Sequence, residues 1–382
     1  MLPSQRHLFD IPRDVCYLNA ASWGPLPRAA VESGRTAVAR KGQPWALPSG
    51  FMPEQIERAR RAAANLINAE PTDIALIPSV SYGVATASKL MSLPPGARVL
   101  LLENDHVSPV LEWRTRAQRE DILCDTVGQP TDGDWTAALL DALERPGAPP
   151  VGVASISSVH WSDGCAIDMV RLGAALRRHG AALLIDATHA AGMLRLDVQV
   201  LDPDFVVFPT YKWVLGPYGC AFLYIAKRHQ SGEPLEQTGA ARRSISSEQA
   251  PYLRDIAYIS GARRFDMGER EFFISLETAA FGMEQVAAWG SAAIGERLRM
   301  LTDRLAEGVR NTKVSIPDAR VRAPHILSLG FPRGVPDGLM QRLSSAQVHA
   351  ALRLGRLRIS PHVYNDEADV DRFLEVFHHC VV

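Results

Sequence analysis

A regular alternation of short apolar runs with amphipathic stretches governs this sequence from about residue 28 onward. The runs have the length of strands, and the stretches of roughly 10 to 15 residues between them have the apolar period of helices. Strands that are apolar throughout and joined by helices are typical of a parallel sheet buried on both faces. The sequence therefore predicts an α/β large domain with a mainly parallel sheet sandwiched by helices. The strand-like runs are IALI (74–77), RVLLLE (98–103), ILCDTV (122–127), VGVASI (151–156), AALLID (181–186), FVVF (205–208) and CAFLYI (220–225).

A second region follows the alternating one. Loop signals cluster from Gln230 to Ser260, and the chain beyond about residue 272 mixes helical patterns with short strands such as HILSLGF and LRIS. One helix is expected near SSAQVHAAL (344–352). This make-up predicts a small α+β C-terminal domain. We expect residues 21–260 to form the large domain, and residues 1–20 and 261–382 to form the small one.

Charge and composition argue against several classes of protein. The 41 basic and 42 acidic residues leave a net charge of -1 without a basic stripe, so no nucleic-acid partner is expected. No apolar stretch approaches the roughly 20 residues that span a bilayer, and the start MLPSQRHLFDIPRD lacks the apolar core of a signal peptide. We therefore expect a cytoplasmic protein with no membrane partner. The five cysteines are scattered without a CxxC pair, so neither a disulfide framework nor a metal site is predicted.

Two charged residues follow neighbouring strands of the predicted sheet. Asp186 ends the run AALLID, and Lys212 comes just after the next run, between Tyr211 and Trp213. Ligands of open parallel sheets bind at the carboxyl ends of the strands, so these side chains are expected to converge on that edge of the sheet. Burial lowers the pKa of a lysine and suits it to Schiff-base chemistry. The chain offers few other positions for such a lysine, since its lysines are Lys41, Lys89, Lys212, Lys227 and Lys313.

Phosphate-binding and ring-binding residues are expected at the same edge. After IALI the chain continues as PSVSYG (78–83) into a helix, whose free N–H groups and dipole suit a phosphate. Three histidines, His106, His160 and His189, follow other strands. Each feature alone is common in ordinary polar loops. Together they match pyridoxal 5'-phosphate, which needs a lysine for its aldehyde, an acid for its pyridinium nitrogen, a phosphate cradle and a ring against its face.

Other nucleotide cofactors are disfavoured. No GxGxxG follows the first strands, and GxxxxGK[ST] does not occur in the sequence. Within the pyridoxal-phosphate hypothesis, His106 is the candidate for the stacked ring. His160 and His189 are candidates for polar contact near the phenolic oxygen.

Longer stretches of the chain resemble a known family. HWSDG, LLIDATHAAG and TYKWVLGPYG resemble blocks of the class V (cysteine desulfurase-like) aminotransferase family of fold-type I pyridoxal-phosphate enzymes. YLNAASWGPLP, SVSYGVAT, ENDHVSPVLEW, GARRFDMGE and LRISPHVYN resemble further blocks in the same order, so the resemblance covers nearly the whole chain. The tyrosine that precedes Lys212, Tyr211, resembles the residue found at this position in the isopenicillin-epimerase-like branch of the family.

The resemblance implies roles for the residues at the sheet edge. Lys212 is expected to bind the cofactor aldehyde, and Asp186 to pair with the pyridinium nitrogen. His189 takes the place where the family often has glutamine beside the phenolic oxygen. The expected cofactor-binding set is Ser81, Tyr82, Gly83, His106, His160, Asp186, His189, Tyr211 and Lys212.

The resemblance also implies how the substrate is held. Arg358 in LRISPHVYN matches the arginine that grips the α-carboxylate of an amino acid, which suits the two parallel hydrogen bonds of a guanidinium. Asn19 and Trp23, in YLNAASWGPLP, are expected beside the substrate. Family members are typically homodimers with sites near the subunit interface, and a homodimer is expected here. Glu269 stands where desulfurases have a neutral hydroxyl residue in the loop that reaches the partner subunit.

The sequence leaves several reactions open. Desulfurases of this type use a cysteine upstream of the small-domain arginine, but this chain has ALRLGRLRIS there and no cysteine between Cys220 and Cys380. We expect an enzyme that acts on the α-carbon of an amino acid through a Lys212 Schiff base, with an aminotransferase as the first expectation. The alternatives are a carbon–sulfur (β-elimination) lyase or an amino-acid epimerase without a catalytic cysteine. A catalytically silent binding module is disfavoured because both Lys212 and Asp186 are present.

Overall fold

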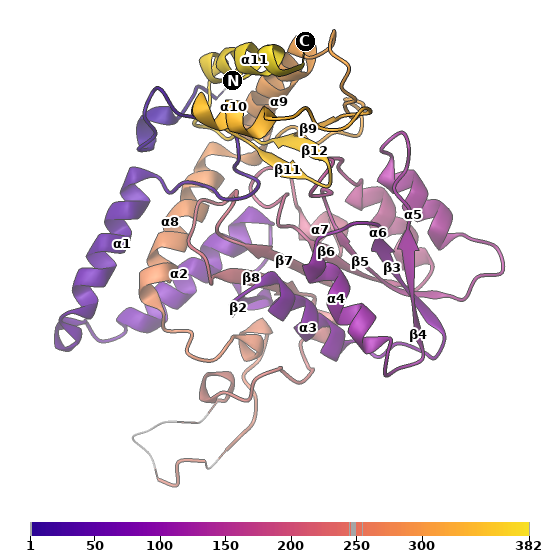
Figure 1. The fold of residues 1–382 in the computed structure, drawn as a ribbon. Helices are drawn as coiled ribbons and strands as arrows, with labels where there is room; N and C mark the ends of the chain where they lie inside the picture. The colour runs from indigo at the N-terminus through magenta and orange to yellow at the C-terminus, as the bar shows by residue number, and fades with distance from the viewer. Residues whose placement is uncertain (1, 244, 246–249, 254, 382) are drawn as a thin grey trace.

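The computed structural model describes residues 2–243, 245, 250–253 and 255–381 (Figure 1). Within these residues, one large sheet has seven strands in the order β2-β8-β7-β6-β5-β3-β4. All neighbours pair in parallel except β8, which is antiparallel to β2 and β7. The predicted mainly parallel sheet is therefore confirmed. The strands are β2 (Ile74–Ile77), β3 (Ala97–Leu102), β4 (Ile122–Val127), β5 (Val151–Ser157), β6 (Ala182–Asp186), β7 (Phe205–Pro209) and β8 (Ala221–Ile225).

Helices cover both faces of this sheet. One face packs against α2 (Phe51–Leu66), α5 (Trp135–Leu143), α6 (Met169–Arg178), α7 (Val198–Leu201) and α8 (Phe273–Trp289). The other packs against α3 (Val80–Leu90) and α4 (Val107–Arg116). Successive side chains of a strand point to opposite faces, so Leu100 belongs to the first core while Val99 and Leu101 belong to the second. This explains why the strands are apolar throughout, and the expected sandwich is confirmed.

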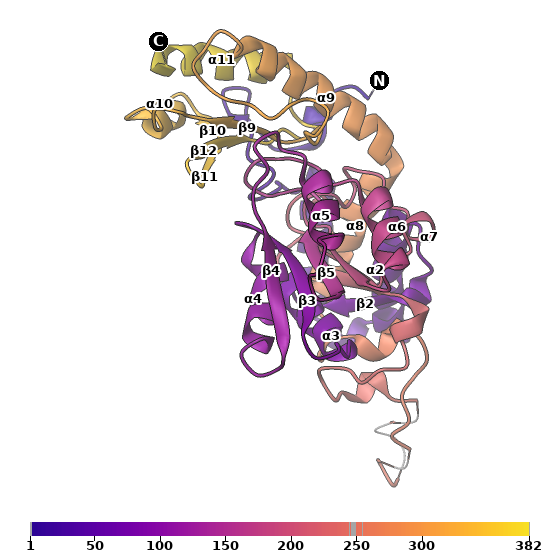
Figure 2. The ribbon, with the colours of Figure 1, turned by 90° about the vertical axis from the view of Figure 1, so that its right-hand side faces the viewer.

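A smaller α+β body lies at one end of the large sheet (Figure 2). Its antiparallel sheet has the order β11-β12-β9. This sheet and the helices of the small body pack around one apolar core. The small α+β C-terminal domain is therefore present as expected from the mixed pattern. Its elements are α9 (Ser291–Gly308), β9 (Leu327–Gly330), α10 (Leu339–Ser345), β11 (Ala351–Arg353), β12 (Arg356–Ile359) and α11 (Glu367–Val381).

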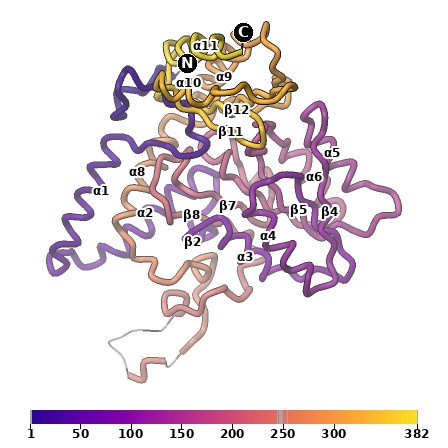
Figure 3. Tube along the Cα trace, in the orientation of Figure 1, coloured from indigo at the N-terminus to yellow at the C-terminus, as the bar shows by residue number. Residues whose placement is uncertain are grey.

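The N-terminal segment joins the two bodies before α1 (Arg28–Lys41) begins (Figure 3). It first forms β1 (Cys16–Tyr17), which pairs in parallel with β10 (Val348–His349) of the small body. The segment then reaches the large body, where the Gly24 N–H donates to the Tyr211 carbonyl at 3.0 Å. A Cβ at Gly24 would lie 1.9 Å from the carbonyl oxygen of Lys212, so this approach requires glycine.

The helix predicted near SSAQVHAAL is wrong in its position. The helix α10 ends at Ser345, and Gln347 then adopts a positive φ of 57°. The following residues form β10 and β11, and β11 turns into β12 through Leu354 and Gly355, both with φ > 0. Two such residues are typical of a type I′ hairpin turn, which fixes the register Arg353↔Arg356.

Helix α8 lies against α1 and α2, in the layer that covers the large sheet (Figure 1). The exact division between domains at residues 20 and 260 stays a prediction.

No helix among the described residues is long and apolar enough to cross a membrane. The five cysteines are all free thiols.

Candidate active site

Lys212 lies in the loop after β7 and is only 7% exposed. Its Nζ is 3.4 Å from Nε2 of His189. Burial lowers the pKa of Lys212 to about 7, and the positive charges of Arg358 and Arg353 act in the same direction while Asp186 opposes them. The amine is thus neutral in a large share of molecules near neutral pH, which is the form that can act as a nucleophile or a base.

Asp186 is buried at the carboxyl end of β6, one strand away from Lys212. Its Oδ1 accepts a hydrogen bond from the Thr188 N–H at 2.9 Å. Burial raises the pKa of Asp186, whereas Thr188, His106 and Lys212 favour its ionised form. Although Asp186 and Lys212 influence each other, no ion pair within 4.0 Å joins them or involves Asp186 elsewhere in the described chain. Asp186 and Lys212 are therefore both buried at this edge without an ion pair between them.

His189 is fixed by Trp213. The indole Nε1 of Trp213 donates to Nδ1 of His189 at 3.0 Å, and the backbone carbonyl of His189 accepts from the ring of His325 at 2.6 Å. Burial first, then Lys212 and Arg358, lower the pKa of His189 well below its usual value, so the ring is neutral. Because an indole only donates, Nδ1 must be the acceptor and Nε2 must carry the proton. His189 therefore presents an N–H toward Lys212.

The start of α3 supplies hydroxyl and N–H groups. Ser79 caps the helix, and its Oγ accepts from the Tyr82 N–H at 3.2 Å and lies 3.1 Å from the Oγ of Ser81. Gly83 serves packing rather than chain reversal, since a Cβ there would lie 2.7 Å from Val207 of β7. The Tyr82 ring contacts the apolar core beside the sheet, and burial and then Glu236 raise its pKa. Tyr82 therefore offers its backbone, not its ring, to a ligand at this helix start.

His106 caps α4, with Nδ1 accepting from the Ser108 N–H at 3.5 Å. Burial and then Lys212 lower its pKa, while Asp186 raises it, and His106 lines the same cavity as Lys212. The preceding Asp105 is half-buried and accepts from the Oγ of Ser157 at 2.6 Å and from its own neighbour, the His106 N–H, at 2.7 Å. Asp105 thereby fixes the position of His106, and its burial raises its pKa to about 6.

His160 is not brought into this group. Its ring stacks on Trp135 at 4.9 Å, its Nε2 is 3.1 Å from the carbonyl oxygen of Glu103, and its Nδ1 is 3.4 Å from Asp163. The hydrogen bond and charge of Asp163 outweigh burial and raise the pKa of His160. Both ring nitrogens therefore have partners, Glu103 after β3 and Asp163 after β5, and His160 takes a supporting position behind Asp105.

Aromatic rings line the mouth of the site. Tyr211 stacks on Tyr218 at 3.7 Å between ring centroids, and Trp23 packs against Tyr218 at 4.5 Å. Trp23 is 58% exposed, so its ring is available at the entrance. Asn19 lies on the same loop, and its buried Oδ1 has no hydrogen-bond partner in the part of the chain that the structure describes.

Arg358 is held at the same edge by the small body. It is 2% exposed on β12, where one terminal nitrogen donates to the Trp161 carbonyl at 2.7 Å and the other to the Oγ of Ser22 at 2.8 Å. Burial and then Arg353 lower its pKa to about 9. A guanidinium so buried and without a carboxylate partner among the described residues is poised for an anion.

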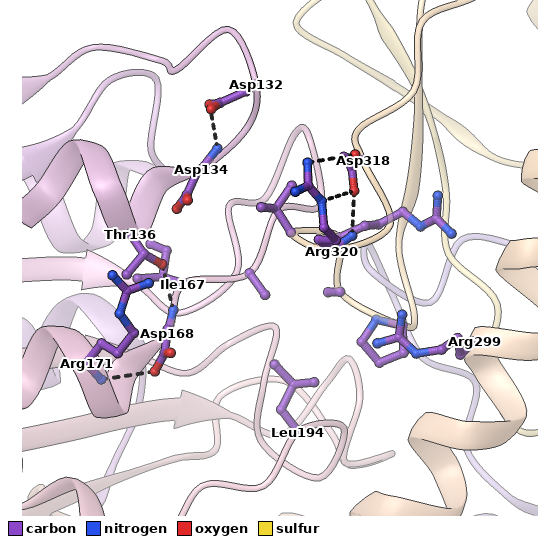
Figure 4. A pocket seen from close by; sticks show the side chains of 15 residues that line it. Asp132, Asp134, Thr136, Ile167, Asp168, Arg171, Leu194, Arg299, Asp318 and Arg320 are labelled. Atoms are coloured by element: carbon purple, nitrogen blue, oxygen red, sulfur yellow. Dashed lines mark hydrogen bonds and ion pairs between the residues drawn. The ribbon is translucent and has the colours of Figure 1, made fainter.

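Some of these side chains line a cavity of about 130 Å³, whereas Asp186, His189 and Arg358 are not among its described lining residues. Its lining includes Ser79, Ser81, His106, Thr188, Tyr211, Lys212 and Tyr218. A cleft of about 560 Å³ lies elsewhere, beside α5 and α6, and its described lining includes no residue of the expected site. Figure 4 shows that the aspartates of that cleft are engaged: Asp168 accepts from the Arg171 N–H, and Asp318 pairs with Arg320. We therefore place the candidate active site at the smaller cavity.

Sequence reasoning missed several members of the site. Thr188 and Tyr218 line the cavity, Trp213 fixes His189, and Ser22 receives Arg358. Thr188 was detectable, because it lies two residues after the acid that ends β6. The contact of Ser22 with Arg358 spans 336 residues of sequence and has no local signal.

The fold and the site define a class of enzyme, and comparison with known proteins agrees. The family model of class-V aminotransferases matches residues 48–373, so the chain belongs to this family. Enzymes of this family use pyridoxal phosphate. The resemblance noted in the sequence is thereby confirmed.

Individual relatives differ in their reactions. The chain is 27% identical over 377 residues to isopenicillin N epimerase of Streptomyces clavuligerus, with 94% of each chain covered. A cysteine desulfurase from Thermococcus onnurineus NA1 has a TM-score of 0.85 at 19% identity, covering 98% of this chain and 97% of that chain. The cystine C–S lyase C-DES has a TM-score of 0.83 at 20% identity, covering 97% and 99%. The structural likenesses support the fold-type I architecture.

Proposed function

We propose that this enzyme holds pyridoxal phosphate in the cavity between Lys212 and the start of α3. The observation that carries the proposal is the buried pair of Lys212 and Asp186, which are electrostatically linked but not in contact. Ser79, Ser81 and the N–H groups of α3 suit the phosphate, because the positive end of the helix dipole adds to their hydrogen bonds. Lys212 suits the aldehyde carbon, and Asp186 suits the ring nitrogen.

Two histidines complete this arrangement. His106 offers a ring to the face of the cofactor, and Asp105 holds it in place. His189 offers its Nε2–H to an oxygen acceptor near Lys212, because Trp213 fixes the opposite nitrogen as an acceptor. When bound, pyridoxal phosphate supplies an electron sink for the negative charge that develops at the substrate α-carbon.

Lys212 is the proposed base for the α-proton. A pKa of about 7 lets the amine accept a proton at neutral pH and return it, which general acid–base catalysis requires. Arg358 is the proposed partner of the α-carboxylate, since two parallel hydrogen bonds would orient the α-carbon toward Lys212. Asn19 and Trp23 lie beside this position and are proposed to contact the substrate.

The proposed reaction is amino-group transfer from an amino acid. Persulfide chemistry of the desulfurase kind is disfavoured, because no cysteine stands between Cys220 and Cys380. Epimerisation is the second candidate, and the observation that favours it is the 94% coverage of both chains in the alignment with isopenicillin N epimerase. A β-elimination lyase is the remaining alternative.

The first experiment locates the cofactor. Borohydride reduction of the loaded enzyme followed by peptide mapping is expected to find the pyridoxyl group on Lys212. A label on Lys41, Lys89, Lys227 or Lys313 would overturn the assignment. Amino acids are then incubated with a 2-oxo acid in deuterium oxide, and the products are separated by chiral chromatography. A new amino acid indicates transfer, a deuterated D-isomer indicates epimerisation, and ammonia indicates elimination.

We also propose that two copies assemble and that the enzyme works in the cytoplasm. Trp23 and Tyr218 are each more than half exposed beside the cavity, and a second copy would cover such rings. The free cysteines fit a reducing compartment. Sedimentation of the loaded enzyme tests the dimer, and a monomer at micromolar concentration would contradict it.

A further inference from the structure

A second arginine stands beside the proposed carboxylate-binding residue. The NH2 nitrogen of Arg353 donates to the Oγ of Ser22 at 2.9 Å, and the NH2 nitrogen of Arg358 donates to the same oxygen at 2.8 Å. Two cationic groups therefore lie within hydrogen-bonding distance of one neutral hydroxyl. Ser22 can accept from both but compensates neither charge.

The positive charge of this pair is not balanced by the protein. Among residues 2–243, 245, 250–253 and 255–381, no carboxylate lies within 4.0 Å of either the buried Arg358 or the half-buried Arg353, although other arginines of the structure are paired, such as the buried Arg60 with Asp266. Arg353 has one further hydrogen bond, to the Leu352 carbonyl at 2.8 Å. The Nε of Arg358 is buried without a partner. A guanidinium has five N–H donors, so each arginine keeps donors free for a ligand.

The hairpin directs both arginines to one side. The register places Arg353 opposite Arg356 and Ala351 opposite Arg358, and opposite residues of an antiparallel pair share a face. Arg356 turns to Ser328 on β9, with Nε donating to its Oγ at 2.8 Å. Arg353 and Arg358 are therefore diagonal neighbours on this face. Ala351, which lies opposite Arg358, has a small side chain and leaves the space between the two arginines open.

This face is turned toward the proposed catalytic lysine. The positive charges of Arg358 and Arg353 both lower the pKa of Lys212. Ser22 belongs to the loop in which the Gly24 N–H donates to the Tyr211 carbonyl and the Gly24 backbone packs against the carbonyl group of Lys212. A substrate held by Arg358 next to Lys212 would therefore have the rest of its chain within reach of Arg353.

We propose that Arg353 is a specificity-determining residue that binds a second carboxylate of the substrate, so that the enzyme prefers amino acids with an acidic side chain. The inference rests on the proposed function, in which Arg358 takes the α-carboxylate. A substrate with one carboxylate would leave one of the two guanidinium groups uncompensated. A diacid neutralises both and gains a second pair of charge-assisted hydrogen bonds.

The test uses acids without an amino group, which bind but do not react. Calorimetric titration of the loaded enzyme compares glutarate with butyrate, and succinate and adipate vary the distance between the carboxylates. The wild type is expected to bind the best diacid about ten- to a hundredfold more tightly than butyrate. Arg353→Gln should abolish this preference and leave butyrate binding unchanged. Arg353→Lys, which keeps the charge, should retain part of the preference.

Arg333→Gln serves as the matched control, because Arg333 is an exposed arginine of the same small body. It is expected to leave both titrations unchanged. Equal binding of diacids and butyrate by the wild type would overturn the inference. So would an equal loss of both ligands in Arg353→Gln, which would mean that the two arginines share one carboxylate.

The two proposals fail in different ways. A missing preference for diacids, with the pyridoxyl label still found on Lys212, would refute only the acidic-substrate inference. A label on another lysine would refute the proposed function. The calorimetric preference is measured on cofactor-free protein as well, so it does not depend on turnover.

Discussion

Replacement of Lys212 by methionine is expected to stabilise the cofactor-free protein. The lysine is almost completely buried, and its pKa falls from an ordinary 10.5 to about 7. At about 1.36 kcal/mol per pH unit, this difference means that holding a charged Lys212 in the folded state costs roughly 5 kcal/mol at pH 7 or below. Methionine fills a similar volume without a charge, so the cost disappears with the substitution.

The pH dependence of the gain has a definite sign. The unfolded chain keeps this proton up to about pH 10.5, whereas the folded chain releases it near pH 7, so rising pH favours the folded wild type within this window. The advantage of Lys212→Met should therefore shrink from roughly 5 kcal/mol at pH 7 to roughly 2 kcal/mol at pH 9. Below pH 7 the advantage should stay constant.

Urea unfolding of both cofactor-free proteins at pH 6, 7, 8 and 9 measures this effect. Lys227→Met is the control, because Lys227 is exposed and should change the free energy of unfolding little at any of these pH values. The reasoning is refuted if Lys212→Met is no more stable than the wild type, or if its gain is the same at pH 7 and pH 9. Either result would mean that the folded protein already solvates or neutralises the amine.

Three further substitutions test the site. Asp186→Asn should keep cofactor absorbance but slow exchange of the substrate α-proton about a hundredfold or more, followed by proton NMR in deuterium oxide; exchange at the wild-type rate would remove Asp186 from the site. Arg358→Lys should weaken binding of α-amino acids by about 1.5–3 kcal/mol in calorimetry, with amines that lack a carboxylate unaffected; a uniform loss would point to misfolding instead. Trp213→Phe should raise the pKa of Lys212 in NMR titration of the cofactor-free protein, because His189 can then turn its acceptor toward the amine; an unchanged pKa would contradict the tautomer assignment.

The sequence could predict the parts of the molecule that depend on local patterns. Strands such as β3 and β6 are buried on both faces, so their composition alone distinguishes them from surface elements. Asp186 and Lys212 could be found because both follow such strands, and parallel strands bring their ends to one edge. His160 follows a strand too, yet its ring turns to Trp135 and Asp163, and the position after a strand does not determine which way a ring turns.

Contacts between distant segments were beyond the sequence. Arg353 meets Ser22 across 331 residues, and only the assembled hairpin and N-terminal loop bring them together. The segment SSAQVHAAL carries a helical pattern, but pairing of Val348 with Cys16 and of Ala351 with Arg358 draws its second half into strands. Tertiary pairing overrides local preference in such short elements.

The path of the N-terminal segment limits how this protein can be recombined with its relatives. Cys16 and Tyr17 pair with the small body, Ser22 then accepts a hydrogen bond from Arg358, and Gly24 packs against the backbone of Lys212. A chimera that exchanges only the C-terminal part of the chain would combine a new β11–β12 hairpin with an N-terminal segment that does not match it. Exchange of substrate preference between homologous enzymes of this kind should therefore succeed only when both ends of the chain are transplanted together.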